Sequence, residues 1–250
     1  MNGFYEGKYI KVAATVLTYL GDYMTEKHRV QKLLSNRGYC SRRRAEELIM
    51  QGRVTVNNKL VSIGASAAES DVIRVDGQAV APIKKIIIAF HKPVGCVTAL
   101  QDKFHKTIMD YIDLKERVFP IGRLDFNTSG LLLLTNDGDF ANSVMHPRYE
   151  VMKTYEARCD TVIGERAVQD MRRGIIIDEK KVQCAVRLVR TNVIELTLHE
   201  GRKHIVKKML KECGLHVITL KRTRIGKLEL GALAVGRWRV LTEDEARRVH

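Results

Sequence analysis

At the centre of the chain's pattern stands Phe119-Pro120-Ile121-Gly122-Arg123-Leu124-Asp125-Phe126-Asn127-Thr128-Ser129-Gly130, followed directly by Leu131-Leu132-Leu133-Leu134. Gly122 and Gly130 bound a polar segment rich in turn-forming residues, which predicts a loop. The four leucines stand between Gly130 and the turn signal Asn136-Asp137-Gly138, and they predict a short strand covered on both faces. Asp125 is the one acid of this loop, and by itself it indicates a turn aspartate that hydrogen-bonds its own backbone.

The composition indicates a globular protein with a polyanionic partner. The chain has 250 residues and 45% hydrophobic content, enough for one large domain or two modest ones. Its net charge of +14 favours nucleic acid over a small neutral substrate. The five cysteines are odd in number and form no C-x-x-C pair, so we expect no disulfide framework, no zinc site and a reducing, cytoplasmic location. No stretch approaches the roughly 18 to 20 apolar residues that span a bilayer, so no membrane association is expected.

Residues 1–27 are expected to form an N-terminal extension. The run from Val12 to Leu20, preceded by two lysines, loosely resembles a signal peptide but lacks a small-residue cleavage site. Met24 stands directly before a strongly patterned region, so residues 1–23 are interpreted as an appendage that arises from an early start codon.

Residues 28–80 predict a small separate module in the order helix, helix, strands. Val30, Leu33 and Leu34 share one helical face, and Ser41 is the expected N-cap of the second helix. Short alternating runs then meet Asn-Asn and Asp-Gly turn signals, which indicates strands joined by tight turns.

Three arginines in the first turn of that second helix indicate a phosphate partner. The helix macrodipole disfavours cations there, so an external anion should compensate them. No acid lies between His28 and Arg44, which favours a phosphate backbone as the partner. A solvated basic face is the alternative. The residues predicted to contact phosphate in this module are Arg29, Lys32, Arg37, Arg42, Arg43 and Arg44.

Residues 81–85 are the expected linker, and residues 86–250 are expected to form a second, larger domain. Its pattern mixes strands and helices. Strands are predicted at 86–90, 153–158, 193–198 and 216–220, and helices at 139–145 and 202–213.

The helix predicted at 202–213 is basic on one side. Apolar residues share one of its faces and cations occupy the other, which again indicates phosphate contact. In this domain, Lys92, in a basic turn after the first strand, either meets the nucleic acid or caps the strand end. The residues predicted to contact nucleic acid are Lys92, Arg202, Lys203, Lys208 and Arg222.

Most familiar catalytic motifs are absent from the sequence. It contains no G-x-x-x-x-G-K-[ST], no G-x-G-x-x-G after a strand, no G-x-S-x-G and no H-E-x-x-H. His199 and His204 lack a credible third ligand and are interpreted as surface or core histidines. A lone carboxylate, Asp125, remains, and it can act as a covalent nucleophile if a cation keeps it ionised and in place. An aromatic side chain could stack on a base removed from RNA.

Residues 29–57 resemble the S4 RNA-binding domain. The similarity rests on Arg29-Val30-Gln31-Lys32-Leu33-Leu34, Gly38, Ser41-Arg42-Arg43-Arg44-Ala45 and Gly52-Arg53-Val54-Thr55-Val56-Asn57. In that family two helices and the following hairpin present a basic surface to structured RNA, so the resemblance implies an RNA partner.

Three motifs of the chain carry a second resemblance. They are Gly122-Arg123-Leu124-Asp125-x-x-Thr128-x-Gly130-Leu131-Leu132-Leu133-Leu134-Thr135-Asn136-Asp137-Gly138, Lys153-Thr154-Tyr155, and Glu200-Gly201-Arg202-x-His204-x-Val206-Lys207-x-Met209. With these motifs, residues 29–245 resemble the S4-domain-containing ribosomal RNA pseudouridine synthases (RsuA/RluB-like).

The resemblance implies roles for five residues of the larger domain. Asp125 would be the catalytic nucleophile, Tyr155 would lie against the target base, and Lys207 would be the basic partner of Asp125. Many relatives have arginine at the position of Lys207, and lysine lacks the bidentate fork, so a less rigidly oriented pair is expected. Arg123 and Leu220 are expected in the substrate pocket, although an ordinary core leucine fits Leu220 equally well.

The fold implied by the resemblance is α+β, with a small S4 domain before a pseudouridine synthase domain whose mixed, largely antiparallel sheet is flanked by helices. The implied reaction converts a specific uridine of ribosomal RNA to pseudouridine. The base is flipped into a pocket, Asp125 helps to break the N1–C1′ bond, the uracil rotates, and C5 rejoins the sugar. Whether Asp125 attacks C1′, adds to C6 or promotes a glycal-like intermediate stays open. Tyr155 is a candidate for the following proton transfer as well as for stacking.

The resemblance implies neither a metal nor a cofactor. It implies ribosomal RNA or a ribosome assembly intermediate as the partner, and a monomer is expected. The segments Asn136–Asn142 and Met145–Glu150 resemble the large-subunit enzymes more than the small-subunit one.

Two other functions stay open at the level of sequence. The first is a non-catalytic S4-type RNA-binding factor in ribosome assembly. The second is a glycosidase or nucleosidase, which normally needs two carboxylates that flank the bond. Asp137 and Asp139 are the nearby candidates for the second carboxylate.

Overall fold

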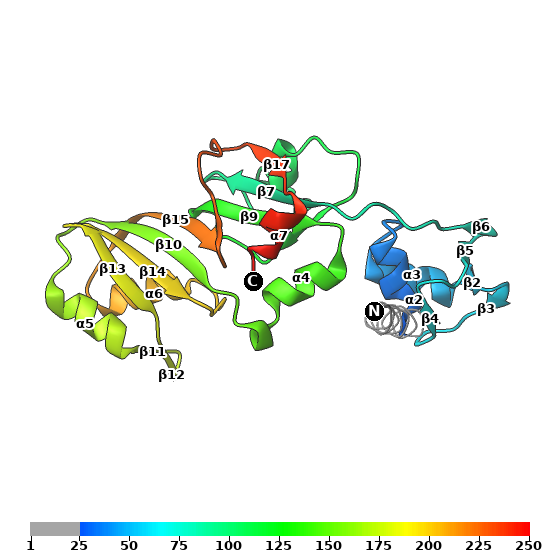
Figure 1. Ribbon diagram of the computed structural model, residues 1–250, viewed down its shortest axis with the longest axis horizontal. Helices are drawn as coiled ribbons and strands as arrows, with labels where there is room; N and C mark the ends of the chain where they lie inside the picture. The colour runs from blue at the N-terminus through cyan, green and yellow to red at the C-terminus, as the bar shows by residue number, and fades with distance from the viewer. Residues whose placement is uncertain (1–25) are drawn as a thin grey trace, which may run out of the picture. The chain divides into compact units, whose positions relative to one another are not determined.

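The computed structural model describes residues 26–250, which divide into two compact units between Lys84 and Lys85 (Figure 1). The predicted appendage, residues 1–23, lies outside the described residues. Lys27, expected in the extension, pairs with Ala68 in the first unit. Within the described part, no helix has the length and apolar character needed to cross a membrane.

The first unit follows the predicted order of two helices and then short strands. The helices are α2 (Val30–Asn36) and α3 (Arg42–Met50). A four-stranded antiparallel sheet has the order β3-β2-β5-β6, and a two-stranded sheet pairs β1 with β4. The strand bounds are β1 (Lys27–Arg29), β2 (Val54–Val56), β3 (Lys59–Leu60), β4 (Ser66–Ala68), β5 (Ile73–Val75) and β6 (Gln78–Ala79).

Local features of the first unit also match the sequence. Val30, Leu33 and Leu34 are fully buried, and the Ser41 hydroxyl accepts a hydrogen bond from the Arg44 amide at 3.2 Å, as an N-cap does. The Asn57–Asn58 turn has positive φ at both residues, 48° and 64°. The N-cap of α3 and the Asn57–Asn58 turn could therefore be predicted from the sequence of this unit.

The second unit is built on a mixed, largely antiparallel sheet, which confirms the predicted fold class. Its strand order is β13-β14-β10-β15-β9-β7-β17, with β16 paired to β15 and β8 paired to β9. The strand bounds are β7 (Ile87–Lys92), β8 (Phe119–Ile121), β9 (Ser129–Thr135), β10 (Lys153–Cys159), β13 (Ala185–Arg190), β14 (Val193–Leu198), β15 (Val217–Ile225), β16 (Leu228–Glu229) and β17 (Trp238–Val240).

Helices flank this sheet, as expected for the α+β class (Figure 1). The α-helices are α4 (Gly138–Met145), α5 (Glu165–Arg173), α6 (Ile205–Glu212) and α7 (Glu243–Arg247). Two 3₁₀ turns, η1 (Ile108–Tyr111) and η2 (Pro147–Tyr149), and a hairpin of β11 (Ile175–Ile177) and β12 (Lys180–Val182) complete the unit. Helix α6 begins three residues later than predicted.

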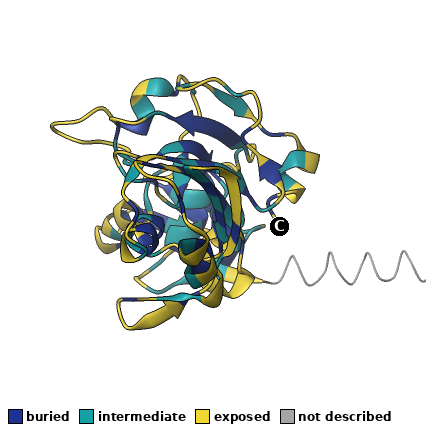
Figure 2. Ribbon diagram, turned by 90° about the vertical axis from the view of Figure 1, so that its left-hand side faces the viewer, coloured by how far each residue is buried: buried dark blue, intermediate teal, exposed yellow. Residues whose placement is uncertain are grey.

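Strand β9 is covered on both faces, as its four leucines predicted. Leu132 and Leu134 belong to one hydrophobic cluster, whereas Leu131 and Leu133 belong to another. All four side chains are fully buried, and Figure 2 shows buried strands enclosed by more exposed segments. The loop that precedes β9 is therefore joined directly to a strand that is buried on both faces.

The pairing of β9 with β15 is the one parallel pairing between named strands of the described chain. It is short, with Lys221 opposite Ser129 and Arg222 opposite Gly130. Gly130 has a φ of +114°, and a Cβ added there would lie 2.2 Å from the Arg222 carbonyl oxygen. Only glycine therefore permits the two strands to approach this closely.

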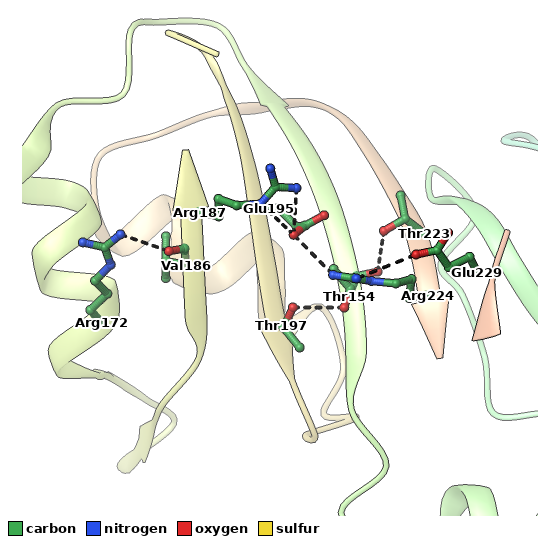
Figure 3. Close-up of polar contacts among 9 residues, drawn as sticks. All are labelled: Thr154, Arg172, Val186, Arg187, Glu195, Thr197, Thr223, Arg224 and Glu229. Atoms are coloured by element: carbon green, nitrogen blue, oxygen red, sulfur yellow. Dashed lines mark hydrogen bonds and ion pairs between the residues drawn. The ribbon is translucent and has the colours of Figure 1, made fainter. Parts of the chain in front are cut away.

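The polar face of β13-β14-β10-β15 is held by contacts between adjacent strands and by one ion pair that spans β10 (Figure 3). Glu195 lies 3.1 Å from Arg187 and 3.4 Å from Arg224, and the hydroxyls of Thr154 and Thr197 are 3.0 Å apart. Because alternate residues of a strand point to opposite faces, Tyr155 is directed away from this polar face. The aromatic ring predicted to meet a base thus belongs to the other side of the sheet.

Candidate active site

The Asp125 loop joins β8 to β9 and is held in place by the side chain of Lys92. The Lys92 ammonium donates to the carbonyl oxygens of Pro93 at 2.9 Å, Asp125 at 3.1 Å and Thr128 at 3.1 Å. Thr98 adds a second anchor, because its hydroxyl donates to the Leu124 carbonyl at 2.7 Å. The backbone on both sides of the Asp125 side chain is therefore fixed.

The prediction that Lys92 contacts nucleic acid is wrong in this structure. Lys92 is fully buried as the last residue of β7, and its ammonium has no exposed face to offer a phosphate. Burial lowers the pKa of Lys92 below its ordinary value. Three carbonyl oxygens compensate the buried charge, so the role of Lys92 is to position the loop.

We expect Lys92→Met to lower both stability and activity. The variant leaves three carbonyl oxygens without their charged donor, so unfolding in urea should show a loss of about 2 kcal/mol. A loop displaced by about 1 Å can lower the turnover rate roughly 10²-fold. Lys180→Met, at an exposed lysine of the β11–β12 hairpin, is the matched control. Wild-type turnover by Lys92→Met would show that the loop holds its position without this lysine.

The Asp125 side chain pairs with two residues at the start of α6. Its Oδ1 lies 3.3 Å from His204 Nε2, and its Oδ2 lies 4.0 Å from Lys207 Nζ. Lys207 thus stands where the family resemblance placed it. The side chain is about one-third exposed, at 32%, so the carboxylate is held yet accessible. Among the described residues, this side chain pairs with residues at the start of α6. The side chain of an ordinary turn aspartate would instead hydrogen-bond its own backbone.

His204 is the residue near Asp125 that the sequence interpretation missed. It precedes α6 with a φ of +58°, a left-handed conformation that is uncommon outside glycine. This backbone conformation turns the imidazole toward Asp125. The sequence signal was the E-G-R-x-H spacing itself, since a histidine three residues before Lys207 lies on the same side of the helix start.

The opposite wall of the site comes from β10 and β15. Tyr155 and Leu220 are both buried, at 8% and 5% exposure, and Arg222 is buried at 3%. The Arg222 guanidinium carbon lies 6.0 Å from the centre of the Tyr155 ring, and its Nε donates to the Leu131 carbonyl at 2.7 Å. Arg222 was predicted to contact RNA, but its burial and these contacts make it a wall of the site.

These two walls enclose a cavity of about 750 Å³. Its lining includes all the residues predicted as catalytic or substrate-binding, which are Arg123, Asp125, Tyr155, Lys207 and Leu220. The structure therefore brings together residues that are up to about a hundred positions apart in the sequence. The volume is in the range of pockets that hold small organic molecules, so it can admit a nucleoside.

The remaining basic residues around α6 differ in their accessibility. Arg202 donates to Glu200 at 2.6 Å and to the Ile177 carbonyl at 2.8 Å, whereas Lys203 is exposed at the cavity. Lys208 pairs with Asp178 at 2.6 Å. Lys203 is therefore the one most available to a polyanion, and Lys208 would have to share its charge with Asp178.

In the first unit the structure separates the predicted phosphate contacts into two groups. Arg37 is buried and donates to the carbonyl oxygens of Val80, Glu69 and Asp71, so its prediction as a phosphate contact is wrong. Its guanidinium instead ties the β4–β5 turn and the end of β6 to α2. The other predicted residues keep surface exposure, as Arg29, Lys32, Arg42, Arg43 and Arg44 are exposed or partly exposed.

The three arginines of α3 form the clearest exposed cationic group of that unit. Arg42 and Arg43 make no ion pair with the described residues, and Arg44 pairs with Glu47 at 2.7 Å. Arg29 donates to the Gly64 carbonyl, and Lys32 Nζ lies 3.4 Å from His28 Nδ1. The first turn of α3 therefore offers the cations of this group that the described residues compensate least.

The other carboxylates near the site are engaged elsewhere. Asp137 caps α4 and pairs with Lys85 at 3.1 Å, beyond the opposite end of β9 from Asp125. In the cavity lining, Glu200 pairs with Arg202, and the amides of Phe104 and His105 hold the Asp102 carboxylate and lower its pKa. Within residues 26–250, no group of three His, Cys, Asp or Glu side chains could hold a metal ion.

Comparison with known proteins places both units in families. Residues 28–73 match the S4 domain, and residues 86–212 match the RNA pseudouridylate synthase family. Together with the cavity, these matches define an RNA-modifying enzyme that carries a separate RNA-binding domain. The chain belongs to the RNA pseudouridylate synthase family, which confirms the enzyme class predicted from its motifs.

Relatives of high similarity cover most of the chain. An uncharacterized RNA pseudouridine synthase of Aquifex aeolicus is 43% identical and covers 87% of this chain and 91% of its own. The ribosomal large subunit pseudouridine synthase B of Bacillus subtilis is 42% identical, over 88% of this chain and 95% of its own. A crystal structure of a pseudouridylate synthase superposes with a TM-score of 0.67 at 27% identity and covers 89% of this chain and 99% of that one.

Proposed function

We propose that this protein converts a specific uridine of large-subunit ribosomal RNA to pseudouridine, with Asp125 as the nucleophile. The proposal rests on one observation. Asp125, its partner Lys207 and the buried ring of Tyr155 all line the same cavity. The similarity to a Bacillus subtilis enzyme named for the large subunit favours that RNA. Small-subunit RNA is the alternative substrate.

The cavity suits a base that has left its helix. An enzyme that acts on a nucleobase must take it out of the stack, at a cost of about a few kcal/mol. Tyr155 offers a ring face in the cavity, and the cationic Arg222, 6.0 Å from the centre of the ring, lines the same cavity. The exposed cations of α3 and Lys203 are suited to hold the RNA backbone, which would offset the cost of flipping.

The surroundings of Asp125 support its proposed action on the sugar of the flipped nucleotide. A carboxylate is a competent nucleophile when it is ionised and oriented. His204 and Lys207 approach different oxygens of Asp125, which favours one orientation of the carboxylate. The chain needs no second carboxylate for this chemistry, since the nucleophile itself is displaced when C5 rejoins the sugar.

Mapping of pseudouridine in ribosomal RNA, at single-nucleotide resolution and with and without the gene, tests the proposal. Loss of one large-subunit site is the expected result, and loss of a small-subunit site would correct the substrate. An unchanged map together with normal RNA binding would favour an assembly factor without catalysis. Release of free uracil from RNA would instead identify a glycosidase.

We expect alanine at Arg42, Arg43 and Arg44 together to weaken RNA binding and to flatten its salt dependence. Loss of three phosphate contacts should reduce the slope of log K against log salt by roughly 2 to 3. The control removes the same charge at Arg166, Arg173 and Lys180, which are exposed and lie outside the cavity. An equal change in both triple variants would mean that net charge, rather than contact at α3, controls binding.

A further inference from the structure

Lys153 lines the cavity, but the mechanism proposed above gives it no role. It begins β10 two residues before Tyr155, and alternate residues of a strand share a face, so both side chains project into the cavity. The Lys153 Nζ donates to the Val151 carbonyl at 2.8 Å and to the His199 carbonyl at 3.3 Å. These two contacts fix the amine in the wall of the cavity that Tyr155 also lines.

The surroundings of Lys153 disfavour its charged form. Desolvation lowers its pKa to about 8, and the nearby positive charge of Arg222 acts in the same direction. A neutral amine has two N–H groups and one lone pair. The two carbonyl oxygens accept one hydrogen bond from each N–H group. The lone pair is then left for the cavity. An amine with a pKa near the working pH is well suited to take a proton.

The reaction requires such an acceptor. When C5 of the uracil has joined C1′, C5 carries both the sugar and its original hydrogen, and the ring is not yet aromatic. The product forms only when the C5 proton leaves. Asp125 serves the sugar, so the C5 proton must pass to another group of the cavity, and Lys153 and the Tyr155 hydroxyl are the candidates.

We propose that Lys153 is the general base that removes the C5 proton in the last step of pseudouridine formation. This inference rests on the proposed function and adds a catalytic residue to it. The C5–H electron pair forms the C5=C6 bond, and the electrons of the N1=C6 bond move onto N1. N1 takes a proton from solvent, and the Lys153 ammonium returns its proton to solvent. The step therefore balances without an oxidant, a reductant or a cofactor.

Lys153→Met and Lys153→Arg test the assignment with RNA that carries deuterium at C5 of its uridines. Methionine removes the amine, whereas arginine keeps the charge and the N–H donors but has no lone pair to offer at neutral pH. Both variants should form pseudouridine about 10²- to 10⁴-fold more slowly. In both, deuterium should slow the reaction by a ratio at least as large as in wild type, because C5 deprotonation then limits the rate.

RNA affinity and the circular dichroism spectrum of both variants should match wild type, which separates a chemical defect from misfolding. Lys221→Met is the matched control, since Lys221 lies on β15, pairs with Glu156 at 3.4 Å and does not line the cavity. It should react at the wild-type rate.

Three outcomes would overturn the role of Lys153. These are a wild-type rate in Lys153→Arg, a slow variant without a deuterium effect, and a deuterium effect that appears only when Tyr155 is changed to phenylalanine. The last would assign the proton transfer to Tyr155. A wild-type protein that makes no pseudouridine would remove the proposed function and this inference together, whereas an active wild type with unaffected variants would remove this inference alone.

Discussion

Asp125→Asn is expected to abolish pseudouridine formation while RNA affinity stays at the wild-type level. Asparagine has nearly the same shape as aspartate but carries no charge and is a poor nucleophile. We expect the rate to fall at least about 10⁵-fold, the scale on which loss of a covalent nucleophile acts in other enzymes. Since Asp125 is partly exposed and pairs at 3.3 and 4.0 Å, its neutralisation should change stability by less than about 1 kcal/mol.

The measurement combines product formation under single-turnover conditions with RNA binding at fixed salt. Asp178→Asn is the matched control, because Asp178 is exposed, pairs with Lys208 and lies outside the cavity. It should turn over at the wild-type rate. Asp125→Asn with wild-type turnover would refute the assignment of the nucleophile, and a large loss of RNA affinity would show that Asp125 acts in binding.

Gly130→Ala should be strongly destabilising. The new Cβ would lie 2.2 Å from the carbonyl oxygen and 2.5 Å from the amide nitrogen of Arg222, and neither backbone atom can move aside cheaply. The residue also has a φ of +114°, which disfavours any side chain. Strain and overpacking together should lower the free energy of unfolding by about 3 to 5 kcal/mol.

Gly214→Ala separates the two contributions to that loss. Gly214 follows α6 with a φ of +73°, and a Cβ added there would meet no atom within 4 Å. Its substitution should therefore cost only the backbone preference, about 1 kcal/mol. If urea unfolding gave equal losses for the two variants, the close approach of β9 and β15 would carry no weight in stability.

Much of the fold could be predicted from the sequence, because residues close together in the chain determine where an element begins and which of its faces are buried. The four leucines of β9 specify burial on both faces, and Ser41 specifies the start of α3. The meeting of Asp125 with Lys207 depends on distant segments, and periodicity alone does not give it. The motif resemblance supplied that pairing, and the structure places the two side chains 4.0 Å apart.

The errors share one physical cause, which is that sequence shows charge but not burial. Lys92 and Arg37 both have several basic neighbours or basic segments around them, so each was predicted to meet phosphate. Apart from that of Pro93, the carbonyl oxygens that surround them come from residues more than 30 positions away, such as Thr128 for Lys92 and Val80 for Arg37. His204 was overlooked for a related reason, because its left-handed backbone is set by the turn before α6.

The short parallel pairing of β9 with β15 has a consequence for the order of folding. It closes a large loop, since Arg222 bonds Leu131 from 91 positions away, and closing such a loop costs more entropy than forming the antiparallel neighbours on either side. We therefore expect it to close late. Asp125 lies on the β9 side of this pairing, and Tyr155 lies on the β15 side. A nascent chain can therefore form the basic surface of its S4 domain well before its catalytic cavity is assembled.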